Sequence, residues 1–85
     1  MAVVETTGKV DYLKLTNGAG FVSIRRDAPT GPATELLIIW WVDQSEGPAA
    51  LFTTELSMAL ARGLRVRLSH FHDSAYIFQV VVEGA

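Results

Sequence analysis

The sequence predicts a mainly β protein in which five strands form a small Greek-key barrel, with one α-helix between the third and fourth strands. Three observations lead to this prediction. Short segments of β-branched and aromatic residues recur along the chain and are separated by glycine and proline. One longer segment places apolar residues at helical spacing. The 85 residues leave room for one hydrophobic core, so we expect residues 1–85 to form a single domain.

The first two strands are predicted at residues 8–15 and 21–25. Apolar and charged residues alternate in the first segment with one slip, which is typical of a β-bulge. The intervening residues 16–20 include an asparagine and two glycines, which accept the positive φ of a tight turn. The two strands are therefore expected to form a hairpin.

The third strand is predicted at residues 36–42, after an exposed loop at residues 27–34. The loop contains two prolines, which lack the amide donor that a sheet interior needs. The strand (LLIIWWV) is short, rich in β-branched and aromatic residues, and bounded by Glu35 and Asp43. Because every position in it is apolar, the sequence predicts that each of its faces has a packing partner.

A helix is predicted between Pro48 and Gly63. Ser45 or Gly47 would cap its start, proline suits the first turn, and glycine suits the residue after the last turn. The stripe that faces the core is expected to contain four apolar residues: Phe52, Leu56, Ala59 and Leu60.

The last two strands are predicted at residues 64–69 and 76–82, joined by residues 70–74. In the first of them aliphatic residues alternate with two arginines, so we expect the aliphatic side chains to point into the core and the arginines to point outward. The second is apolar on both faces, like the third strand.

This order of elements resembles that of the OB-fold, a five-stranded Greek-key barrel whose helix follows the third strand. The resemblance covers nearly the whole chain and rests on element order, so it implies a fold more than a function. An SH3-like barrel and an open α+β sheet with the helix on one face remain as alternatives.

Residues 18–22 (GAGFV) are similar to the glycine-aromatic signature of the cold-shock OB domains, which stack nucleic-acid bases on aromatic side chains. Ala19 stands where that family has an aromatic ring, and Asn17 stands where it has a basic residue. Pentameric toxin-binding subunits built on OB-folds share the element order as well, so glycan binding is a further alternative.

The OB resemblance implies that the third and fifth strands lie side by side, so their outward residues would form one apolar patch. This predicts a homo-oligomer whose subunit contact contains Leu37, Ile39, Trp41, Ile77 and Val81. The alternative is that the helix, the amino-terminal residues or the long loop covers this patch within one chain.

A ligand surface is predicted from the cations and aromatic residues that an OB domain would place on one face: Lys14, Arg25, Arg26, Trp40 and Tyr76. The preferred hypothesis is a homo-oligomeric binding or assembly module of unknown ligand. Its alternative is a small protein that binds single-stranded nucleic acid, and a protein partner also fits. The net charge of −2 disfavours tight binding to phosphate, and the plainest interpretation is that the tryptophans are buried and the arginines solvated.

No catalytic or metal site is predicted, and we expect a non-enzymatic protein without a cofactor. The chain has no cysteine, and no carboxylates are spaced so as to face each other across a cleft. His70, His72 and Asp73 supply two imidazoles and a carboxylate. Without another strong ligand, a solvated turn is the better interpretation of these residues.

A cytoplasmic location without a membrane partner is expected. The longest apolar run, residues 36–42, is too short to cross a bilayer as a helix. The amino-terminal residues lack the basic and apolar parts of a secretory signal.

Overall fold

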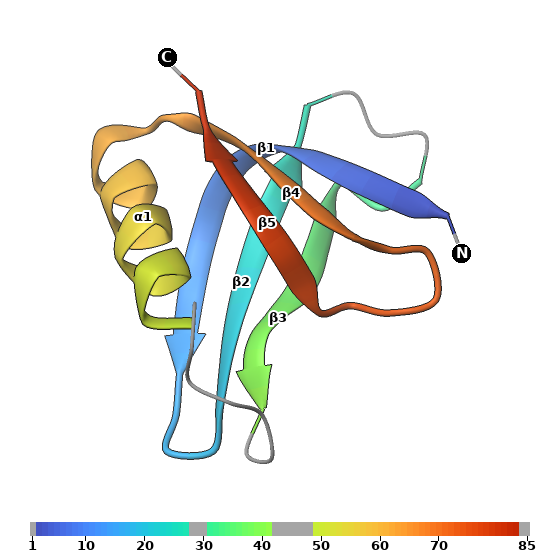
Figure 1. Ribbon diagram of the computed structural model, residues 1–85. Coiled ribbons are helices and arrows are strands. Elements are labelled where there is room, and N and C mark those ends of the chain that lie inside the picture. The colour runs from blue at the N-terminus through green and yellow to red at the C-terminus, as the bar shows by residue number, and fades with distance from the viewer. Residues whose placement is uncertain (1, 28–30, 42–48, 84–85) are drawn as a thin grey trace.

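The computed structural model describes residues 2–27, 31–41 and 49–83, except for the side chain of Trp41. The predicted mainly β class, with its helix between the third and fourth strands, is confirmed (Figure 1). In chain order the elements are β1 (Val3–Leu15), β2 (Ala19–Arg26), β3 (Thr34–Trp41), α1 (Ala49–Arg62), β4 (Arg65–Phe71) and β5 (Ile77–Val82).

The five strands form one antiparallel sheet in the order β3-β2-β1-β4-β5. In the part of the chain that the structure describes, this sheet is open, and it does not form the closed barrel that the sequence predicts. Its two edges nevertheless meet, because Ile38 forms a parallel bridge with Tyr76. The sheet therefore curls, and Figure 1 shows β4 and β5 crossing over the hairpin of β1 and β2.

The central strand β1 is longer than predicted, since it begins at Val3 and not at residue 8. Residues 8–15 pair with β2, whereas residues 3–9 pair with β4, which lies far away in the sequence. The predicted irregularity is confirmed: the register shifts between Val10 and Tyr12, so that Asp11 is the additional residue of a bulge.

Gly8 occupies the point where β1 has a partner on each side, Arg26 on β2 and Val66 on β4. A Cβ atom at this position would lie 2.0 Å from the backbone carbonyl oxygen of Arg25. No side chain fits in that space, so glycine permits the close approach of the two strands.

The hydrophobic core fills the inside of the curled sheet, and α1 covers it at one end (Figure 1). The helix packs mainly on β1 and also contacts β3, β4 and β5. The predicted alternation of β4 is confirmed, because Val66 and Leu68 are fully buried. The core consists of Val10, Val22, Ile24, Leu37, Ile39, Ala49, Leu56, Ala59, Val66, Leu68 and Ile77.

The helix ends where the sequence predicts, at a Gly63 whose φ of 64° is the left-handed conformation that glycine accepts. The amide of Leu64 donates to the carbonyl oxygen of Ala59 at 2.9 Å, which satisfies one of the last helical carbonyls. The predicted capping residues lie outside the described residues: Ser45, Gly47 and Pro48.

The predicted apolar stripe of the helix needs one correction. Leu56 and Ala59 are buried and Phe52 packs against the core, but Leu60 is 40% exposed. Each residue turns the helix by about 100°, so a residue next to Ala59 points away from the centre of the buried stripe. Ala49, which lies about two turns before Leu56 on the same face, completes the stripe instead.

Candidate binding surface

Two rows of side chains cross the outer face of β1, β2 and β3. Residues that pair directly in a sheet point to the same side, so the register defines these rows. Tyr12 and Leu36 are 47% and 49% exposed, and they flank the small Ser23. In the second row, Lys14 Nζ lies 6.0 Å from the centroid of the Phe21 ring. The rows are Tyr12, Ser23, Leu36 and Lys14, Phe21, Ile38.

Apolar side chains continue this surface from β3 across the meeting point with β5. Ile38 bridges to Tyr76, and Tyr76 and Phe78 flank the buried Ile77, so both lie on the outer side of the chain. The ring of Phe78 lies 4.9 Å from that of Phe71, centroid to centroid. We call this surface the outer apolar band, and it consists of Phe21, Leu36, Ile38, Tyr76, Phe78 and Phe71.

The predicted subunit-contact residues are mostly on the other side of these strands. Leu37, Ile39 and Ile77 are 1%, 6% and 6% exposed and belong to the core, so their assignment to the outer surface is corrected. Val81 is half-buried opposite Arg67, and the side chain of Trp41 lies outside the described residues. Because every position of residues 36–41 is apolar, alternation could not reveal which set faces inward.

The predicted ligand residues are brought together only in part. Lys14 lies beside Phe21, next to the outer apolar band, and Tyr76 lies within that band. Arg25 is on the same outer face as Lys14, but its guanidinium pairs with Asp11 at 2.8 Å. The charge of Arg25 is therefore already compensated by a neighbouring carboxylate.

Two further predicted ligand residues are placed elsewhere. Trp40 is half-buried and packs against the core, and its ring lies so close to Gly20 that a Cβ atom there would be 2.1 Å away. Arg26 donates to the carbonyl oxygen of Pro32 at 3.2 Å and lines a separate cavity. Tyr12 and Phe21 are not among the predicted ligand residues, although the bulge before Tyr12 is the signal that turns this side chain outward.

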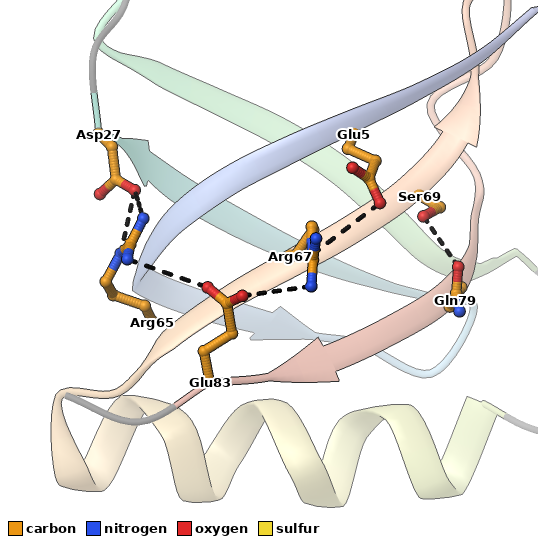
Figure 2. Close-up of polar contacts among 7 residues, drawn as sticks. All are labelled: Glu5, Asp27, Arg65, Arg67, Ser69, Gln79 and Glu83. Carbon is orange, nitrogen blue, oxygen red and sulfur yellow. Dashed lines mark hydrogen bonds and ion pairs between the residues drawn. The ribbon is translucent and has the colours of Figure 1, made fainter.

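A chain of ion pairs covers the outer face of β1, β4 and β5 (Figure 2). Glu83 contacts both arginines of β4, with Oε2 3.2 Å from Arg67 Nη2 and Oε1 4.0 Å from Arg65 Nη1. Arg65 also pairs with Asp27, and Arg67 Nε lies 3.9 Å from Glu5 Oε2. The hydrogen bond to Asp27, and then its charge, raise the pKa of Arg65. Within this chain of ion pairs, three acidic side chains face two arginines.

The histidines do not form the solvated pair that the sequence predicts. His70 belongs to β4 and is 5% exposed, whereas His72 is exposed in the turn that follows. The alternation of β4 explains this difference, because His70 falls on the same face as Val66 and Leu68. Among residues 2–27, 31–41 and 49–83, no group of three or more histidine, cysteine or acidic side chains could hold a metal ion.

His70 adjoins an open cavity of about 260 Å³ beside the first half of β1. Thr6 donates from Oγ1 to Glu35 Oε1 at 2.8 Å, and the same oxygen lies 3.1 Å from His70 Nε2. Thr6 and Glu35 belong to the cavity wall, so this polar cluster connects the interior to the surface. The wall is formed by Val4, Glu5, Thr6, Arg26, Pro32, Thr34 and Glu35.

The described helix falls short of the length and apolar character that crossing a membrane requires. Comparisons with protein-family models, with curated proteins and with solved structures give no match to this chain.

Proposed function

We propose that this protein is a non-enzymatic, OB-like binding and assembly module that associates with further copies of itself through the outer apolar band. The observation that supports this proposal is the continuity of apolar side chains across the junction of β3 and β5. Ile38 and Tyr76 join at a bridge, and Phe78 and Phe71 extend the band on the far side. Large contiguous apolar surfaces on small domains are typical of interaction sites.

Three features support an OB-like architecture for this module. The helix follows the third strand, β1 pairs with both β2 and β4, and the edges of β3 and β5 meet in parallel orientation. In a five-stranded Greek-key barrel of the OB type, the same order of elements curls around one core. The approach of Ile38 to Tyr76 is the step from an open sheet toward such a barrel.

Burial of the outer apolar band between two copies of the chain would release enough free energy to support association. An apolar patch of roughly 300–600 Å² contributes about 7–15 kcal/mol at ~25 cal/mol per Å² when it is removed from water. The loss of translational and rotational freedom costs about 4–15 kcal/mol. When both partners bury such a patch, the balance favours a dimer or a larger oligomer at micromolar concentration.

The native mass, measured by light scattering after size exclusion, tests the assembly proposal. We expect a discrete oligomer in the wild type and a monomer in Leu36→Lys and Phe78→Lys, since each substitution puts a charge into the outer apolar band. Leu51→Lys is the matched control, because Leu51 is 69% exposed on α1 and lies away from the band. A wild type that stays monomeric at a concentration of about 100 µM contradicts the proposal, because a dimer stabilised by about 8 kcal/mol would have formed.

One specific observation favours a second function, the binding of single-stranded nucleic acid. Tyr12 is exposed on the outer face of β1, and Phe21 lies on the same face beneath the ammonium group of Lys14. Exposed aromatic rings next to cations suit the stacking of bases along a phosphate backbone, at about 1–3 kcal/mol per base. The ion-paired state of Arg25 limits the free positive charge on this face.

Fluorescence anisotropy with a labelled oligonucleotide tests this second function. If it is correct, the affinity falls as salt is added, and Lys14→Glu weakens binding much more than Arg62→Glu. Both variants change the net charge by the same amount. Arg62, however, is an exposed residue in the last turn of α1, whereas Lys14 lies with the aromatic side chains on β1 and β2. Equal effects of the two variants, or no binding by the wild type, would exclude a dedicated nucleic-acid surface at Lys14.

A further inference from the structure

The first half of β1 runs beside β4 and continues past the end of β2 (Figure 1). On the β4 side, residues 3–9 are paired. On the β2 side, pairing runs from Leu15 back to Gly8, and the amide of Asp27 then donates to the carbonyl oxygen of Thr7 at 3.1 Å. In the part of the chain that the structure describes, β2 pairs with β1 no further than this bond. Residues 3–6 of β1 therefore have a second edge that β2 does not cover.

Two hydrogen bonds show which backbone groups point toward this second edge. The carbonyl oxygen of Thr7 accepts from the β2 side, whereas that of Ala2 accepts from the amide of His72, at 3.1 Å, on the β4 side. In an antiparallel ladder both backbone groups of a residue point to the same side, and the side alternates from one residue to the next. The groups of the even-numbered residues thus face β4. Those of Val3 and Glu5 face the edge that β2 leaves open.

An open cavity of about 260 Å³ lies against this edge. Its wall includes Val4, Glu5 and Thr6, which follow one another in β1. Because consecutive side chains of a strand point to opposite faces, a space that touches all three lies beside the edge and not over one face. Pro32 and the start of β3 form the opposite wall. A second cavity, of about 250 Å³, follows the same edge as far as Asp27.

Arg26 supplies a positive charge at one end of this space. Its half-buried side chain belongs to the walls of both cavities, and Nη1 donates to the carbonyl oxygen of Pro32 at 3.2 Å. No carboxylate of residues 2–27, 31–41 and 49–83 forms an ion pair with it. A guanidinium has five N–H donors and binds a carboxylate through two parallel hydrogen bonds. Arg26 therefore retains donors for an anionic group in the cavity.

The two acidic residues of the first cavity already have partners. Glu35 Oε1 accepts from the hydroxyl of Thr6 at 2.8 Å, and Glu5 Oε2 lies 3.9 Å from Arg67 Nε on the outer face. Their negative charges disfavour an anion that binds along the middle of the edge. An incoming carboxylate is consequently best placed at the end of the space, directly against Arg26.

We propose that the edge of β1 at Val3 and Glu5 binds the C-terminal end of an extended peptide by β-strand addition, with the terminal carboxylate at Arg26. The main chain of the peptide pairs with the open backbone groups of β1, as it does where other peptides add a strand to an exposed edge. This site lies apart from the outer apolar band, so the proposal is independent of self-association.

The position of Arg26 also determines the direction of the bound peptide. Arg26 lies at the end of β2, opposite Gly8, so it marks the C-terminal end of the uncovered segment of β1. A peptide whose carboxylate lies there runs parallel to β1. The cavity of about 260 Å³ is smaller than the roughly 300–1,000 Å³ of sites for drug-sized molecules, and it suits a short chain end.

Amide hydrogen exchange of the wild-type protein without ligand tests whether the edge is open. We expect the amide of Glu5 to exchange at least about tenfold faster than those of Val4 and Thr6, which face β4. Fraying of the chain terminus would accelerate Val4 more than Glu5, so the comparison with both neighbours separates fraying from an open edge. Equal protection of the three amides would overturn the proposal, because the edge would already be paired.

An NMR titration with a mixture of N-acetylated tripeptides of random composition tests the class of ligand. Pairing through the main chain tolerates many sequences, so we expect millimolar mixture to shift the resonances of Glu5 and Arg26. The same mixture with amidated C-termini should bind at least about tenfold more weakly, because it lacks the charge that Arg26 recognises. Acetate at equal concentration should shift Arg26 alone. Equal shifts with both mixtures, or none at Glu5, would contradict the proposal.

Three variants separate the contributions of the charge and of the edge. Arg26→Gln should weaken binding of the free-carboxylate mixture at least about tenfold, whereas Arg25→Gln should not, because Arg25 points to the other face and pairs with Asp11. Glu5→Pro removes the amide at the open edge and retains the pairing with β4, so it should fold and lose binding of both mixtures. If Glu5→Pro does not fold, the two arginine variants decide: equal losses in both would refute a carboxylate site at Arg26.

Discussion

The backbone amide of Ile38 donates a hydrogen bond to the carbonyl oxygen of Ala75 at 2.8 Å, and this bond joins the two edges of the sheet. Ile38 belongs to β3 and Ala75 precedes β5, so residues far apart in the sequence close the curl at this point. The bond also fixes which side chains face outward near the junction. Ile38 and Tyr76 lie outside, and Leu37 and Ile77 lie in the core.

Substitution of Gly8 should destabilise the protein strongly. In Gly8→Ala the new Cβ atom would collide with the backbone carbonyl oxygen of Arg25, which cannot move without separating β1 from β2. We expect a loss of about 3 kcal/mol or more, measured by urea denaturation. Gly31→Ala is the matched control, because its Cβ would have only ordinary contact with Arg26 at 3.9 Å. Equal stability of the two variants would show that β1 and β2 are less closely packed than described.

The packing of Trp40 on Gly20 can be followed by fluorescence. In Gly20→Ala a methyl group would occupy the place of the indole ring, 2.1 Å from its nearest atom, so the ring must leave its position against the core. We expect the tryptophan emission maximum to shift to longer wavelength because the indole becomes more exposed to water. An unchanged spectrum in a folded Gly20→Ala protein would mean that Trp40 does not pack over this glycine.

The orientation of α1 leads to a paired prediction for two leucines of the same helix. Leu56 is fully buried and Leu60 is 40% exposed. Leu56→Ala should therefore cost about 3 kcal/mol of unfolding free energy, because it leaves a cavity, whereas Leu60→Ala should cost less than about 1 kcal/mol. Chemical denaturation of both variants checks the difference. The reverse order would place Leu60 in the buried stripe, which is where the sequence predicts it.

The ion pairs of Glu83 should contribute to stability only at low ionic strength. Glu83 binds both arginines of β4 from the end of β5, and these side chains are partly solvated. Glu83→Gln should lower the unfolding midpoint slightly at about 0.05 M salt and have no effect near 1 M, where charges are screened within about 3 Å. A salt-independent loss would indicate that Glu83 acts through packing and not through its charge.

Much of the secondary structure was predictable from the sequence, because local signals determine it. Alternation placed Val66 and Leu68 in the core, and Gly63 marked the end of the helix through its tolerance of positive φ. These signals act between residues that are close in the chain. The slip in the pattern near Asp11 likewise indicated the bulge in β1.

The faces of the apolar strands, the extension of β1 and the surroundings of His70 were decided only by the tertiary structure. Where every position is apolar, as from Leu36 to Trp41, no periodicity distinguishes the core side from the outer side. The first half of β1 is a strand because β4 pairs with it from the other end of the chain. His70 in turn acquires its partners Thr6 and Glu35 because the sheet curls, and these contacts between distant residues leave no local pattern in the sequence.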